Sequence, residues 1–128
     1  MISASVIIIQ GTTMTFYKTS SNEISFTTDS SVPEGTTILT PNTTDGAYEK
    51  HVPVIDHHGD SVLVKVGSVA HPMLEQHYIQ WIVLETATGY QKHDLKPGEA
   101  PEASFVATEP VIAAYEYCNL HGLWMGKP

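Results

Sequence analysis

Strand-like segments follow one another along almost the whole chain. They are rich in β-branched and aromatic residues, and they lie at 5–10, 14–18, 23–28, 61–66, 77–85, 103–108 and 111–117. Clusters of Gly, Pro, Asn, Asp and Ser separate them, at 30–35, 41–46, 56–60, 87–90 and 96–102. No segment repeats its apolar residues at a helical period. Short strands with turns about every 8–12 residues are typical of an all-β sandwich.

Two segments indicate how such a sandwich would be built. In 61–66 the residues Val62, Val64 and Val66 alternate with other residues, so they share one face of a strand. The segment 77–85 is long and aromatic-rich, which predicts a central strand buried on both faces.

The stretch PNTTDG, at 41–46, has the composition of a linker. The residues before it are rich in Ser and Thr and hold no His or Cys, whereas all seven histidines follow it. We therefore expect a small N-terminal β-module at 1–40 and a larger β-sandwich domain at 41–128.

The net charge of −8, from 6 basic and 14 acidic residues, argues against a nucleic-acid partner, because binding phosphates requires clustered Lys and Arg. The apolar run Val6 to Ile9 is too short to span a bilayer. No basic residue precedes that run, so it does not predict a signal peptide. We expect a cytoplasmic protein with no membrane partner.

Seven histidines and one cysteine direct attention to metal chemistry. His51 precedes a Val-Pro step, and His71 and His77 flank a proline in a segment that suits a loop leading into a strand. Cys118 and His121 form a C-x-x-H pair that one tight turn can present together. These residues offer one sulfur and four nitrogens, one donor more than a closed tetrahedral zinc site needs. Such a set suits iron or copper as well as zinc, and five ligands would leave a sixth octahedral position open.

Ordinary explanations exist for each of these residues alone. A single histidine is more often a surface or core residue than a ligand, and a lone cysteine is often an inert buried side chain. His57, His58 and His93 lie in polar, turn-like surroundings and receive no predicted role. The sequence contains neither a nucleophile-elbow pattern nor a Gly-rich phosphate loop.

Taken together, four stretches resemble the superoxide reductases of the desulfoferrodoxin and neelaredoxin family. They are NTTDGAYEKHVPVI, VKVGSVAHPMLEQHYIQW, LKPGEAPEASF and EYCNLHG. The resemblance implies an immunoglobulin-like β-sandwich whose loops hold one mononuclear iron. It assigns the equatorial nitrogens to His51, His71, His77 and His121 and the axial thiolate to Cys118. It also implies that the backbone N–H groups of Leu120 and His121 hydrogen-bond the sulfur.

The same resemblance assigns roles to two residues before His51. Glu49 would be the carboxylate that covers the oxidised iron at its sixth position, and Lys50 would be the cation near the open site. Members with two irons carry a rubredoxin-like N-terminal module with four cysteines. The matching positions here are Thr19, Asn22, Ser31 and Val32, none of which supplies a thiolate. We therefore expect one iron per chain and an N-terminal module without metal.

The function implied is the one-electron reduction of superoxide to hydrogen peroxide, with a rubredoxin-like protein as electron donor. A homo-oligomer, either a dimer or a tetramer, is the expected assembly. Two alternatives remain open from the sequence: a metal-binding electron-transfer protein without a substrate, and an immunoglobulin-like binding module without metal.

Overall fold

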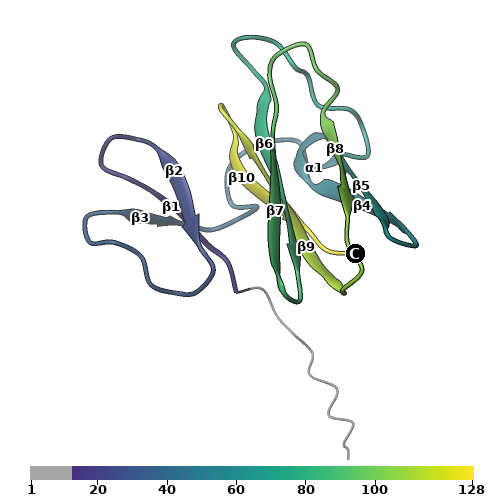
Figure 1. Cartoon of the computed structure of the whole chain (residues 1–128). Coiled ribbons are helices and arrows are strands. Elements are labelled where there is room, and N and C mark those ends of the chain that lie inside the picture. Colours follow the sequence, from purple (N-terminus) through teal and green to yellow (C-terminus); the bar gives the residue numbers. More distant parts are fainter. Residues whose placement is uncertain (1–12) are drawn as a thin grey trace, which may run out of the picture.

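The computed structural model describes residues 13–128, so the segment predicted as a strand at 5–10 lies outside them. The described chain consists almost entirely of antiparallel strands, which confirms the all-β prediction (Figure 1). The elements are β1 (Thr15–Lys18), β2 (Ile24–Thr27), β3 (Thr37–Leu39), α1 (Tyr48–His51), β4 (Pro53–His58), β5 (Ser61–Val66), β6 (Ile79–Thr86), β7 (Gly89–Asp94), β8 (Glu102–Val106), β9 (Val111–Cys118) and β10 (Gly122–Gly126).

Seven of these strands form a sandwich. One sheet has four strands in the order β10-β9-β6-β7, and the other has three in the order β4-β5-β8. This division into four and three antiparallel strands is that of an immunoglobulin-like fold. The strand β6 lies between β9 and β7 and has buried residues on both faces, as the sequence predicted.

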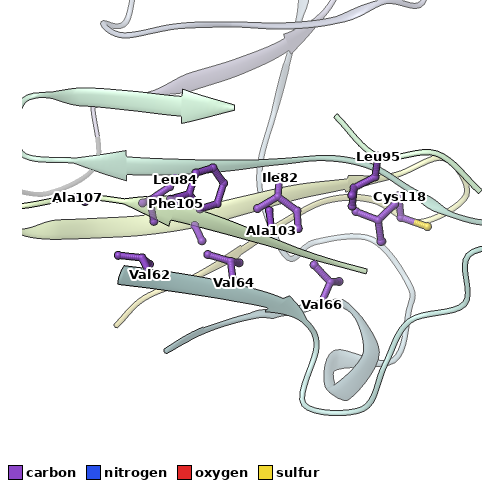
Figure 2. Close-up of a cluster of buried hydrophobic side chains, with 12 residues drawn as sticks. Val62, Val64, Val66, Ile82, Leu84, Leu95, Ala103, Phe105, Ala107 and Cys118 are labelled. Atoms are coloured by element: carbon purple, nitrogen blue, oxygen red, sulfur yellow. The ribbon is translucent and has the colours of Figure 1, made fainter. Parts of the chain in front are cut away.

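The core lies between the two sheets. Val62, Val64 and Val66 point inward from β5, each at most 1% exposed, and they pack against inward residues of β6 such as Ile82 and Leu84. Burying one such side chain contributes about 1.5–3 kcal/mol. Figure 2 shows Cys118 at one end of this cluster, on the same side as Val66 and Leu95. The hydrophobic core between the two sheets therefore ends at Cys118.

The N-terminal strands form a separate sheet, in the order β2-β1-β3, that lies beside the sandwich (Figure 1). This sheet packs on the outer face of the four-stranded sheet. The ring of Phe16 is stacked on Trp81 at 5.6 Å between centroids, and it contacts Tyr115 at 4.6 Å. The predicted boundary between residues 40 and 41 stays a prediction, but the two parts share this aromatic cluster.

The structure corrects one boundary and adds elements that the apolar pattern did not reveal. The cluster 56–60 was expected to be a turn, but β4 continues to His58 because it pairs with β5 as far as Ser61. Only Gly59 and Asp60 turn, and Gly59 has a positive φ of 59°. The edge strand β7 is largely polar, and β10 is short and bounded by glycines, so both exist through pairing with their neighbours. Nowhere in 13–128 does a helix have the length and hydropathy needed to cross a membrane.

The shared aromatic cluster predicts that the N-terminal sheet and the sandwich unfold together. Phe16→Ala removes a side chain that is 2% exposed. It should lower the free energy of unfolding by about 3–5 kcal/mol, in one cooperative transition measured by urea denaturation. Ile38→Ala in the same sheet is the control, because Ile38 is 56% exposed. An unchanged main transition in Phe16→Ala would contradict the prediction.

Candidate metal centre

The five residues singled out from the sequence meet at one end of the sandwich. His51 is the last residue of α1, and Cys118 is the last residue of β9. His71 and His77 lie in the connection between β5 and β6, and His121 lies in the turn between β9 and β10. One potential ligand atom from each residue lies within 4.8 Å of all the others. Three separate stretches of the chain, at 51, 71–77 and 118–121, therefore converge on one point.

The distances between donor atoms are short. His51 Nε2 lies 3.0 Å from His121 Nδ1 and 3.2 Å from His71 Nε2. The sulfur of Cys118 lies 3.5 Å from His71 Nε2 and 3.9 Å from His121 Nδ1. The four imidazoles form a closed ring in which each neighbouring pair meets edge to face, with centroids 4.6–5.0 Å apart. Donor atoms packed this closely can all bind one cation, and that arrangement is more favourable than contacts among the donor atoms alone.

Backbone carbonyls set the orientation of two rings. His51 Nδ1 lies 2.7 Å from the carbonyl oxygen of Ala47, and His71 Nδ1 lies 2.6 Å from that of Pro72. A carbonyl only accepts, so each Nδ1 carries the hydrogen and each Nε2 presents its lone pair to the centre. Hydrogen bonds of this kind fix the tautomer of metal-binding histidines.

Burial favours the neutral form of three of these imidazoles, those of His51, His71 and His77. It lowers the pKa of His71 from its usual value to about 4, against the opposing hydrogen bond to Pro72. It also lowers the pKa of His51 and, together with the nearby charges of His121 and Lys50, that of His77. Neutral imidazole is the form that binds a metal, so the site is ready for a cation at neutral pH.

Cys118 is fully buried. Burial raises the pKa of its thiol, while the backbone N–H groups of Leu120 and His121 lower it by hydrogen bonding to the sulfur. These are the two donors that the resemblance implied. They stabilise negative charge on the sulfur once a metal replaces the proton.

Sequence reasoning did not find Asn119, which joins two of the ligand segments. Its side-chain oxygen accepts from the N–H of Tyr78 at 2.9 Å, and its side-chain nitrogen donates to the carbonyl of Gln76 at 3.0 Å. These bonds flank His77. The residue inside the C-x-x-H turn therefore holds the loop that carries His77, although no spacing in the sequence indicates this.

Trp124 was also missed, and it supports two further ligands. Its indole is stacked on His51, with centroids 4.9 Å apart and an angle of 30° between the rings. Its N–H donates to the carbonyl of His121 at 2.9 Å. A Cβ atom on Gly46 would lie 3.1 Å from Trp124 and 3.3 Å from the His51 ring. Glycine at this position lets the 43–47 loop lie directly over the site.

Asn42 ties that loop to β10. It accepts from the N–H of Met125 at 2.7 Å and donates to the carbonyl of Met125 at 3.0 Å. Its own N–H donates to the carbonyl of Leu123 at 3.0 Å. The backbone at Asn42 has a positive φ of 63°, and Asn is one of the few residues other than Gly that adopts this conformation readily.

The remaining charged residues near the centre have distinct environments. Glu49 and Lys50 are exposed on α1, next to His51. The charge of Glu49 raises the pKa of His51 and that of Lys50 lowers the pKa of His77, so both residues act on the site electrostatically. Glu116 is buried beside the core, and neither of its oxygens has a hydrogen-bond partner within residues 13–128. Burial raises its pKa well above the ordinary value and so favours the neutral acid.

Histidines without a predicted role lie elsewhere. His57 and His58 are exposed on β4, and His93 is exposed on β7. His58 Nε2 contacts Asp56 at 2.8 Å.

A metal fits the centre on two observations. His77 Nε2 is buried and has no hydrogen-bond partner in the part of the chain that the structure describes, and coordination would satisfy it. The donor set is four imidazoles and one thiolate, which exceeds a closed zinc site and suits iron. The pattern that describes the desulfoferrodoxins matches residues 43–127, which include all five donors.

The chain belongs to the desulfoferrodoxin family. It is 53% identical over 91 residues to a desulfoferrodoxin of Syntrophotalea carbinolica, a match that covers 70% of this chain and 71% of the relative. It is 33% identical over 100 residues to a superoxide reductase of Pyrococcus abyssi, covering 62% of this chain and 86% of the relative. The crystal structure of the superoxide reductase from Treponema pallidum matches with a TM-score of 0.75 and 40% identity, over 89% of this chain and 98% of that one.

The protonation states of this desulfoferrodoxin site predict how metal binding depends on protons. At pH 8 the buried imidazoles are neutral, whereas the raised pKa of Cys118 keeps its thiol protonated. Binding Co²⁺ to metal-free protein should therefore release about one proton per metal, from Cys118. Calorimetry in buffers of different ionisation enthalpy measures this number. Cys118→Ala should bind Co²⁺ without proton release, and equal release in both proteins would contradict the assignment.

Proposed function

We propose that the protein is a superoxide reductase, with Cys118 and the four clustered histidines as the ligands of a mononuclear iron. The reaction adds one electron and two protons to superoxide and yields hydrogen peroxide. The convergence of four imidazoles and one thiolate within 4.8 Å carries this proposal. The names of the matching relatives and the overall similarity to the Treponema pallidum enzyme support it.

The ligands divide by exposure. His51, His71 and Cys118 are buried, whereas His77 and His121 are partly exposed. Bound iron would alternate between its ferrous and ferric states and so supply the single electron. The protein holds the thiolate at the inner end of the site and hydrogen-bonds it, which tunes its donation to the metal.

Lys50 and Glu49 are proposed to act on small anions at the exposed side. Lys50 provides positive charge in a protein whose net charge of −8 otherwise repels superoxide. Glu49 offers a carboxylate that can compete with external anions for the remaining coordination position. Their exposure on α1, directly before His51, supports both roles.

An electron donor and an assembly state complete the proposal. Each superoxide consumes one electron, so a one-electron donor protein of the rubredoxin type must resupply the site. We also propose a homo-oligomer, either a dimer or a tetramer. A cytoplasmic location remains the expectation from sequence.

Metal analysis with visible spectroscopy tests the proposed function. Native protein should contain about one iron per chain and should be coloured when oxidised, because a thiolate–iron site absorbs visible light, whereas zinc would be colourless. Cys118→Ser should lose that colour and the reaction with superoxide, with the fold largely kept. An iron protein that does not react with superoxide would be an electron carrier, and native protein without metal would favour a binding module.

Lys50→Ala tests the role of the local charge. If the ammonium lies roughly 6 Å from the bound anion, its attraction is about 0.7 kcal/mol in water and about 2.8 kcal/mol at an effective dielectric near 20. Superoxide capture should therefore slow by a factor of roughly 3 to 100 and depend less on ionic strength. Pulse radiolysis at several salt concentrations measures both.

Two matched variants complete that experiment. Lys50→Arg should retain most of the rate, because the charge is kept. Lys65→Ala removes a lysine that is also exposed, on β5, and should leave the rate unchanged. Equal rates and salt slopes in Lys50→Ala and wild type would show that Lys50 is only a surface charge.

A further inference from the structure

A groove separates the N-terminal sheet from the turn that carries His121. Its volume is about 440 Å³. One wall includes Lys18, Ile38 and Leu39 from β1 and β3, and the other includes Asn119, Leu120 and His121. We call this the His121 groove. A partner seated in it would touch both the metal-free sheet and a proposed iron ligand.

The groove leads to the redox site along a route that differs from the α1 side. Neither Glu49 nor Lys50 lines it. The imidazole of His121 is partly exposed, and its Nδ1 lies 3.9 Å from the sulfur of Cys118. An electron that arrives at His121 has therefore reached the donor set itself. A macromolecule docked here would leave the α1 side free for a small anion.

The chemistry of the walls indicates the kind of partner. Ile38 and Leu120 are 56% and 60% exposed and face the groove from its two walls. Among the residues of 13–128 that line it, Lys18 is the only lysine and none is a carboxylate, although the chain has 14 Asp and Glu residues. Exposed apolar residues beside a lysine, with no carboxylate among the described lining residues, suit a partner that presents apolar contacts ringed by carboxylates.

The surface next to the His121 groove differs from it in charge. A second depression shares Lys18, Tyr117 and Asn119 with the His121 groove and adds Lys92. Glu23 also lines that depression, and Lys92 is paired with Asp94 at 3.3 Å. That depression therefore carries charges of both signs, whereas the described residues that line the His121 groove include Lys18 and no carboxylate.

We propose that a small, acidic one-electron donor protein docks in the His121 groove and that the N-terminal sheet forms half of its docking surface. This inference rests on the proposed function, because it assumes that the clustered histidines and Cys118 hold a redox metal. The donor loses one electron for each superoxide reduced, and that electron enters the site on the side of His121. The N-terminal sheet then serves recognition without holding a metal.

The test compares rates of reduction of the oxidised, iron-loaded protein. Reduced rubredoxin is the protein donor, and ascorbate is the small reductant. Ile38→Glu and Lys18→Glu place negative charge on the N-terminal wall and touch none of the proposed ligands. Each should slow reduction by rubredoxin by about tenfold or more. Reduction by ascorbate should change much less, and reaction with superoxide should remain at the wild-type rate.

A matched control separates the groove from general charge effects. Val106→Glu adds the same charge at a position that is 70% exposed on β8, in the other sheet of the sandwich. It should reduce the rubredoxin rate far less than Ile38→Glu does. Because these reductions are measured without superoxide, they are independent of whether the protein reduces superoxide.

Three results would overturn the proposal. One is a wild-type rubredoxin rate that both groove variants retain. Another is a wild-type protein that rubredoxin reduces no faster than ascorbate does. The third is a change of oligomeric state in Ile38→Glu, measured by light scattering, with the rubredoxin rate unchanged, which would assign the groove to a second copy of this chain.

Discussion

The pairing of β9 with β6 on one side and β10 on the other determines where the sulfur lies. Cys118 pairs with Ile79 of β6 and with Gly122 of β10, at the point where the ladders end. Its side chain is packed at the end of the hydrophobic core, and the following turn directs two N–H groups at it. A thiolate is stable at such a buried position only with a cation and hydrogen bonds, and this end of the sandwich provides places for both.

The histidine segments are held around that sulfur by contacts outside the ligand set. Asn119 fastens the His77 loop, and Trp124 contacts both His51 and the turn of His121. The close approach of the loop at Gly46 depends on the absence of a side chain there. These contacts hold the donor atoms close together in a buried place. A buried polar atom without a partner, such as His77 Nε2, costs about 1–3 kcal/mol, and binding a metal would remove that cost.

The N-terminal sheet has two relations to the rest of the molecule. Through Phe16 it shares an aromatic cluster with the outer face of the four-stranded sheet. Through Lys18 and Ile38 it forms one wall of the groove that leads to His121. This sheet has no cysteine to hold a metal, but it is packed into the fold and lies at the edge of the metal site.

Much of the fold and the site could be predicted from the chain alone. The alternation of Val62, Val64 and Val66 indicated a strand with one buried face, and the long apolar run around Ile82 indicated a central strand. Both could be predicted because the spacing of apolar residues reflects which faces of a strand are buried. The metal ligands could also be predicted, because only His, Cys and a few other side chains bind such metals. The largely polar strand β7 escaped detection because it exists through its pairing with β6.

The supporting residues of the site were decided by the tertiary structure. Asn42 and Asn119 lie inside stretches that carry the family resemblance, but the sequence does not show what their side chains, or that of Trp124, contact. Their importance comes from contacts across large sequence separations, such as the 83 residues between Asn42 and Met125. The sequence by itself determined which atoms could bind a metal. Only the folded chain decided that three distant segments bring those atoms to one point, because backbone pairing and close packing, rather than residue type, set the distances between them.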